Sequence, residues 1–191
     1  MLLLRLILVA VVLVVVGCKS GDPVKEIDQL IAQKKYIQAK EKFQELVDNG
    51  AGPVVERRYI EFLYERKLYR DFSKQIKHYL DEYPNDKEVR SLQFDYYARL
   101  AQDAERMGNY QDAMFYIVTH LLSPDYREYR KWESHQTTVL RKWYEDAAAK
   151  NDEGDKKKAI TQMINLSFEN LARTLDPDLF QSLSSQSAEE N

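Results

Sequence analysis

Residues 108–113 read GNYQDA, a sequence typical of a tight turn between two helices. Gly108 tolerates the left-handed backbone conformation that reverses a chain at the end of a helix. Tyr110 offers an aromatic ring for packing on the preceding helix, and Ala113 is small enough to let two helices approach closely. The stretch therefore predicts a tight turn, followed at once by a helix that packs on the one before it.

The same spacing occurs four times along the chain: an aromatic or long side chain, a small or apolar residue three positions later, and an apolar residue four beyond that. The four sets are Tyr36, Ala39 and Phe43; Tyr69, Phe72 and Ile76; Tyr110, Ala113 and Ile117; and Lys156, Ala159 and Met163. Their first members lie 33, 41 and 46 residues apart. Self-similarity at such intervals indicates a helical repeat.

Glycine and proline punctuate the chain between these segments. There are only six glycines and five prolines, and they cluster at points such as GAGP at residues 50–53 and YPND at residues 83–86. This punctuation predicts an all-α chain. We expect helices near residues 23–34, 37–48, 54–67, 70–82, 86–107, 110–122, 126–150 and 155–174. Helical spacing predicts these core residues: Ile27, Leu30, Ile31, Tyr59, Ile60, Leu63, Tyr97, Leu100, Ala101 and Ala104.

The stretch at 108–113, together with Pro84 fifteen residues after Tyr69, resembles the tetratricopeptide repeat. The resemblance covers about residues 23–170 and implies antiparallel helix pairs stacked as a solenoid of about four units. The family's tryptophan and leucine-glycine pair are absent, Lys156 replaces an aromatic residue, and Phe72 stands where alanine is usual. An irregular antiparallel helical bundle with similar turns is the alternative.

The N-terminus has the parts of an export signal: Arg5, an apolar run over residues 6–16, and Gly17 directly before Cys18. Residues Val15, Val16, Gly17 and Cys18 resemble the lipobox of bacterial lipoproteins. The resemblance implies cleavage after Gly17 and acyl groups, such as palmitate, on Cys18. A retained transmembrane helix is the alternative, but a spanning helix needs about 20 apolar residues, and this run reaches that length only by including Arg5.

Four segments follow from these patterns. We assign residues 1–17 to a signal peptide, 18–22 to the lipidated cysteine and a tether, 23–175 to the helical repeat domain and 176–191 to a disordered polar tail. Lys19 follows the cysteine, where an aspartate retains lipoproteins of enteric-type bacteria in the inner membrane. By that resemblance we expect the outer membrane, facing the periplasm, with the inner membrane as the alternative.

Composition and motifs argue against several classes of function. Without residues 1–17 the chain has 27 Lys and Arg against 31 Asp and Glu, a net charge of about −4, whereas nucleic-acid binders are normally basic. His78, His120 and His135 lie on different predicted helices without metal-ligand spacing, and no Gly-rich phosphate loop occurs in the sequence. We expect no enzyme activity, no cofactor and no metal.

The remaining expectation is partner binding. The family resemblance implies a ligand groove lined by the first helix of each pair. Its positions fall here on Arg57, Glu61, Tyr64, Asp95, Ala98, Gln102, Arg106, Arg141 and Tyr144. A mixed-charge surface of this kind suits a protein segment, which predicts a scaffold or adaptor for another cell-envelope protein, of the outer-membrane or pilus and secretion assembly type.

Two alternatives to the scaffold stay open. A helical enzyme or small-ligand-binding domain would need a pocket near Trp132, His135 and Trp143. The aromatic residues concentrated there, Tyr126, Tyr129, Trp132, Trp143 and Tyr144, suit either packing or partner binding. A purely structural envelope protein without a discrete partner is the other alternative.

Overall fold

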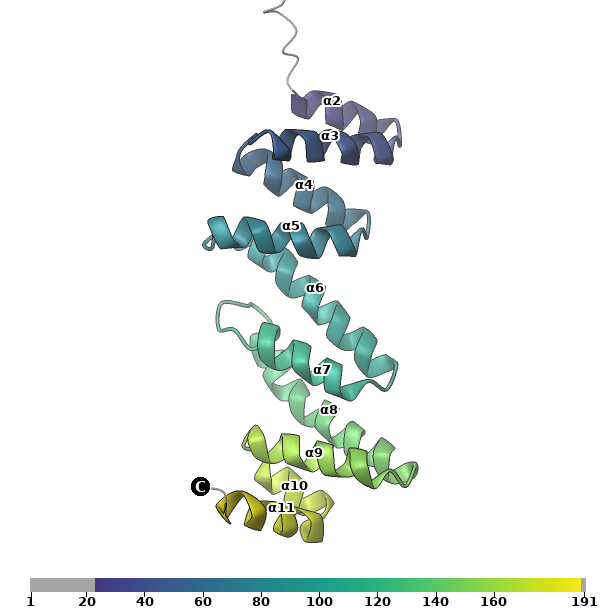
Figure 1. Cartoon of the computed structure of the whole chain (residues 1–191), viewed down its shortest axis with the longest axis vertical. Helices are drawn as coiled ribbons and strands as arrows, with labels where there is room; N and C mark the ends of the chain where they lie inside the picture. The colour runs from purple at the N-terminus through teal and green to yellow at the C-terminus, as the bar shows by residue number, and fades with distance from the viewer. Residues whose placement is uncertain (1–22, 190–191) are drawn as a thin grey trace, which may run out of the picture. The chain divides into compact units, whose positions relative to one another are not determined.

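A computed structural model describes residues 23–189 of the chain. Within this range 81% of the residues are helical, no strand occurs, and ten helices pack in neighbouring pairs (Figure 1). The α-helices are α2 (Pro23–Ala32), α3 (Tyr36–Asp48), α4 (Pro53–Glu65), α5 (Tyr69–Glu82), α6 (Lys87–Arg106), α7 (Tyr110–Tyr116), α8 (Tyr129–Ala149), α9 (Glu153–Asn165), α10 (Glu169–Leu175) and α11 (Pro177–Glu189), and a π-helix η1 (Ile117–Leu121) continues α7. The all-α prediction is confirmed.

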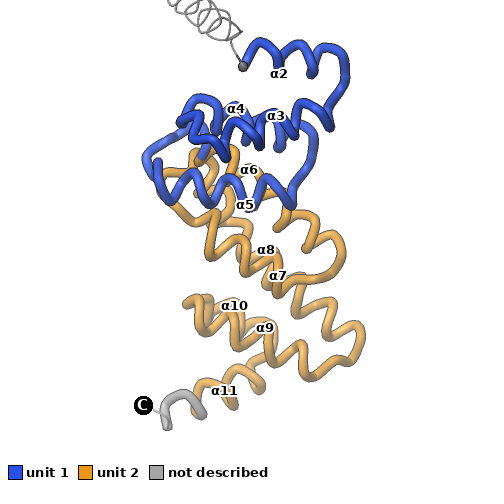
Figure 2. The backbone as a smooth tube through the Cα atoms, turned by 45° about the horizontal axis from the view of Figure 1, so that its top comes forward, with its two compact units in different colours: residues 1–89 blue, residues 90–191 orange. Residues whose placement is uncertain are grey.

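The chain divides into two compact units, Met1–Val89 and Arg90–Asn191 (Figure 2). In the first unit α2 packs on α3, α3 on α4 and α4 on α5. In the second unit α7 packs on α8, α8 on α9, α9 on α10, and α11 on both α9 and α10. Most of these contacts join helices that are neighbours in sequence, as in repeat proteins, where each element buries its apolar face on the next.

The four repeated motifs supply core positions in both units. Their second and third members are all between 0 and 3% exposed: Ala39, Phe43, Phe72, Ile76, Ala113, Ile117, Ala159 and Met163. Positions four apart on a helix share one face, so each pair places a continuous apolar stripe against the neighbouring helix. Burying one such large apolar side chain contributes roughly 1.5–3 kcal/mol.

Five turns share one backbone geometry. The turn residues Lys34, Lys67, Gly108, Asn151 and Ser167 all have a positive φ, between 53 and 74°. At Lys67, for example, the backbone N–H donates to the Tyr64 carbonyl at 3.0 Å, and the next N–H, of Leu68, donates to the Leu63 carbonyl at 2.9 Å. This is the Schellman arrangement, which satisfies carbonyls that have no partner at a helix end.

Each of these turns leads directly into the following helix. The turn residue always lies two positions before the first helical residue, as Lys67 does before Tyr69 and Gly108 before Tyr110. At Gly108 the predicted left-handed conformation is confirmed, with a φ of 74°. In α9 the helix begins at Glu153, so that Lys156 lies one turn inside it.

The predicted single helix over residues 155–174 is wrong. The chain leaves α9 after Asn165 and starts α10 at Glu169, with Ser167 in the left-handed region at a φ of 62°. Leu166 and Phe168, on either side of this residue, pack against the core of the second unit. Neither glycine nor proline marks the break in the sequence. Apolar packing of the two flanking side chains stabilises it instead.

Helix α11 occupies residues that were assigned to a disordered tail. Asp176 precedes Pro177 and accepts a hydrogen bond from the Leu179 backbone N–H at 3.1 Å, which caps the helix. Leu179, Phe180 and Leu183 then pack against the core of the second unit. Their spacing is typical of an amphipathic helix. The many serines around them give the stretch a polar composition, which is why it was assigned to a disordered tail.

Residues 1–22 and 190–191 lie outside the described range, and so do the predicted signal peptide, Cys18 and the tether. Among the described helices, none combines the length and the apolar character required to cross a bilayer.

The turn geometry predicts opposite effects for two substitutions. Gly108→Ala should lower the free energy of unfolding by about 1 kcal/mol, because a Cβ clashes with the backbone at a φ of 74°. That Cβ would meet no atom within 4 Å, so the backbone conformation alone is tested. Lys67→Gly should raise the same free energy by up to about 1 kcal/mol.

Urea unfolding measures both effects. Gly154→Ala, at the second residue of α9, is the control for a glycine outside the left-handed region and should not lower the free energy of unfolding. If the Gly108→Ala protein is as stable as the wild type, the positive φ at this turn does not require glycine.

Candidate functional site

The residues predicted to line a groove on the first helices are termed the first-helix set. On α4, Arg57 lies near two carboxylates, with its Nη1 atom 3.7 Å from Asp86 Oδ2 and 3.9 Å from Glu88 Oε2. Glu61 accepts a hydrogen bond from Arg58 at 3.4 Å through its Oε2 atom. Both members of the set therefore take part in ion pairs within the first unit.

Two tyrosines of the set are half-buried and pack within their own units. The Tyr64 ring, on α4, lies 5.3 Å from that of Phe72 between centroids. Tyr144, on α8, donates a hydrogen bond from its hydroxyl to Asp176 Oδ2 at 2.8 Å, which connects α8 to the start of α11. Burial and this hydrogen bond raise the pKa of Tyr144. These side chains stabilise the fold.

The other members of the set belong to the second unit. Asp95, on α6, accepts a hydrogen bond from the Tyr126 hydroxyl at 3.4 Å, and burial raises the pKa of Asp95. Ala98 packs against the core of this unit. Gln102, Arg106 and Arg141 are exposed on α6 and α8, with Arg106 paired to Asp103.

The aromatic residues of the alternative site lie mainly in the core. Trp132 is 2% exposed and Trp143 is 5% exposed, and both belong to the core cluster of the second unit. The Trp143 Nε1 atom donates to Asp155 Oδ2 at 3.2 Å, so its polar edge is bound at the start of α9. Tyr126 is buried beside them, and its ring stacks on Phe94 at 4.5 Å between centroids. This cluster serves packing.

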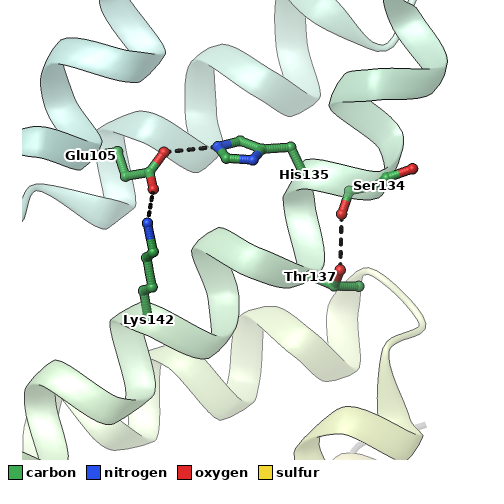
Figure 3. Close-up of polar contacts among 5 residues, drawn as sticks. All are labelled: Glu105, Ser134, His135, Thr137 and Lys142. Atoms are coloured by element: carbon green, nitrogen blue, oxygen red, sulfur yellow. Dashed lines mark hydrogen bonds and ion pairs between the residues drawn. The ribbon is translucent and has the colours of Figure 1, made fainter.

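His135, the third residue of that alternative, takes part in a polar cluster at the surface of the second unit (Figure 3). Its Nε2 atom lies 2.8 Å from Glu105 Oε2, and Lys142 Nζ lies 2.6 Å from Glu105 Oε1. Figure 3 shows the imidazole and the ammonium group, both from α8, approaching the two oxygens of one carboxylate from α6. We call these three residues the Glu105 cluster.

The charges within the Glu105 cluster stabilise one another. The Glu105 side chain is only 14% exposed, and burial alone would raise its pKa. Hydrogen bonds from Lys142 and His135 outweigh that effect, so the pKa of Glu105 lies below its ordinary value. In return, Glu105 raises the pKa of Lys142. Both oxygens of the carboxylate have a partner, so the cluster connects two helices as an ion pair.

Sequence reasoning singled out His135 but missed Glu105 and Lys142. The only signal was the seven-residue spacing of His135 and Lys142, which places both side chains on one face of a helix. Glu105 lies 30 residues from His135 and 37 from Lys142 in the chain. No local pattern indicates a pairing over that distance.

His120 is a packing residue of the second unit. Its ring stacks on Tyr97 at 3.5 Å between centroids and 2° between planes, and burial lowers the pKa of His120. It lies in η1, whose wider turns continue the predicted helix of residues 110–122. Across the described residues 23–189, no group of three or more His, Cys, Asp or Glu side chains is placed to hold a metal ion.

Comparisons of the chain with models of protein families, with curated proteins and with solved structures found no match.

The Glu105 cluster predicts a stability effect that depends on pH. Glu105→Gln should lower the free energy of unfolding at pH 7 by about 1–2 kcal/mol, because it removes the charge that Lys142 and His135 share. The folded-state pKa of Glu105 is depressed, so this stabilisation is complete above the unfolded pKa of about 4.3. It is lost as the pH falls through the folded pKa.

Urea unfolding of both proteins at pH 7 and at pH 3 measures this difference. Glu145→Gln, at an exposed position of α8, is the matched control and should change stability little at either pH. A penalty for Glu105→Gln that is equally large at pH 3 would contradict the assignment of the effect to the charge.

Proposed function

We propose that this chain is a bacterial lipoprotein whose helical domain is a protein-interaction scaffold or adaptor in the cell envelope. The observation that carries the proposal is the recurring left-handed turn, which opens the next helix two residues later at five places. Helices joined in this way pack on their sequence neighbours. In helical repeat proteins, the faces turned away from those contacts commonly bind a partner segment.

The finer proposal is a tetratricopeptide-like solenoid of about four units. The burial of the second and third members of all four motifs supports it. The first two turn residues, Lys34 and Lys67, lie 33 residues apart, close to the period of about 34 in that family. Helices α10 and α11 follow the four motifs and are suited to cap the apolar end of such a stack.

We propose Cys18 as the attachment point to the membrane. It is the only cysteine of the sequence and directly follows Val15, Val16 and Gly17. Each acyl chain contributes about 0.8 kcal/mol per buried methylene, and several chains on one cysteine give stable anchoring. Helix α2 begins at Pro23, and an extended chain spans at most about 3.5 Å per residue, so the domain would lie close to the bilayer. Lys19 favours the outer membrane, facing the periplasm.

The proposed partner is another cell-envelope protein, in an assembly of the outer-membrane or pilus and secretion type. Within the first-helix set, Gln102, Arg106 and Arg141 are exposed and accessible to it. Their long polar side chains suit hydrogen bonds and ion pairs with a protein segment. No catalytic role is part of the proposal.

Substitution of the cysteine tests the anchor. Cys18→Ser should abolish incorporation of labelled palmitate and either release the protein from membranes or leave the precursor with residues 1–17 attached. Palmitate labelling, membrane fractionation and the size of the protein measure these effects in the original cells. Ser20→Ala is the matched control and should behave like the wild type. A Cys18→Ser protein that is labelled, processed and membrane-bound would refute the anchor.

A further inference from the structure

A groove with a volume of about 940 Å³ lies along α3 in the first unit, and we call it the α3 groove. Tyr36, Ile37 and Leu68 line one end of it. Ile37 is 76% exposed and Leu68 is 36% exposed, although both are large aliphatic side chains. Neighbouring exposed apolar side chains within a hollow are typical of a surface that another molecule covers.

One ion pair and one cation–π contact restrain the walls of the α3 groove. The Arg66 guanidinium lies over the Tyr36 ring, 4.2 Å from its centroid, and this cation–π contact restrains both side chains. Lys40, which also lines the groove, forms an ion pair with Asp71 at the start of α5. A groove with restrained walls loses little entropy when a ligand binds.

The other end of the α3 groove is acidic. Glu41, Glu45 and Asp48 line it, one to three turns beyond Ile37. The last turn of α3 contains no basic residue. The partial negative charge of the helix C-terminus therefore adds to that of the carboxylates. Lys42 lies 3.2 Å from Glu45 and neutralises part of the charge. Of the two cations that line the groove, Lys40 is paired with Asp71 and Arg66 lies over Tyr36 at the apolar end. The remaining negative potential favours a positively charged ligand.

We propose that the α3 groove binds a basic amphipathic helix of a partner protein, and this rests on the proposed scaffold function. Apolar side chains of that helix would cover Ile37 and Leu68, and its Lys or Arg side chains would pair with Glu41, Glu45 and Asp48. From Tyr36 to Asp48 the groove follows about 18 Å of helix, which a partner helix of about 12 residues matches. Helices dock along such surfaces through anchors at positions i, i+4 and i+7.

The charge of the α3 groove also distinguishes a protein partner from a lipid surface. Carboxylates at one end repel anionic headgroups, whereas a membrane-binding surface is normally basic. The groove lies on the second helix of a pair, so it is separate from the first-helix set, of which Arg57 and Glu61 on α4 are members. Both surfaces are available to a scaffold.

The test uses a fluorescein-labelled peptide of about 14 residues with leucine at positions i, i+4, i+7 and i+11 and lysine on the flanking positions. The control peptide has glutamate in place of lysine. Each is titrated with the intact protein in a non-ionic detergent, followed by fluorescence anisotropy, and a titration with detergent alone is subtracted. The lysine peptide should bind at least about tenfold more tightly than the glutamate peptide.

Two variants and two matched controls locate the binding. Ile37→Ser and Glu41→Lys should each weaken binding of the lysine peptide by about tenfold, while circular dichroism remains that of the wild type. Met107→Ser and Glu145→Lys likewise replace an exposed apolar side chain by serine and an exposed glutamate by lysine, in the second unit, and should leave binding unchanged. Equal binding of both peptides, or equal losses in variants and controls, would overturn the proposal.

Failure of the groove and failure of the scaffold have different signatures. If an envelope protein copurifies with the wild type and is retained in full by Ile37→Ser, the scaffold stands and the groove proposal falls. Binding of anionic vesicles that depends on Ile37 would overturn the protein-partner proposal and assign the groove to lipid.

Discussion

A left-handed turn residue at a helix end sets the direction in which the next helix leaves at five places in this protein. A helix ends with carbonyl groups that lack partners, and one residue of positive φ returns two backbone N–H groups to them. Because the next helix begins two residues later, the turn also fixes which side chains meet the preceding helix. The small and apolar residues of the repeated motifs that follow these turns are buried, among them Ala39 and Ala113.

Helical spacing predicted part of the core, but Leu30, Ile31, Tyr97, Leu100 and Ala104, which it also placed there, are only partly buried. Ile27, Ile60 and Leu63 are all 0% exposed, as their helical spacing predicts. The glycine at position 108 predicted a left-handed turn residue, whereas the serine at position 167 did not. A residue with a Cβ enters the left-handed region at a cost of about 1–2 kcal/mol, which packing of the flanking helices offsets. Tertiary packing, unlike propensity, cannot be recognised in a local stretch of sequence.

The candidate sites were less predictable than the fold for the same reason. The first-helix set came from a family pattern, and the structure shows where its members lie and which of them, Tyr64 and Tyr144, pack within their own units. The Glu105 cluster requires α6 and α8 to be side by side. The α3 groove likewise requires Leu68, from the turn before α5, to reach a hollow along α3. Only the folded chain brings such residues together.

A stack of helices that uses its inner faces for the core has its outer faces free for recognition. In the proposed account the lipid anchor keeps those faces near a membrane, and an acidic groove and exposed polar side chains present two surfaces to an envelope partner. In that proposal, recognition depends on the shape and charge of the helix faces, which leave no short motif in a sequence.

The most direct test is purification of the intact protein from its own cells in mild detergent, with mass spectrometry of both the copurifying proteins and the N-terminal peptide. We expect an N-terminal peptide that begins at an acylated Cys18, together with enrichment of one envelope complex. An unmodified Cys18 behind an intact residue 1–17 segment, with no enriched protein, would contradict it.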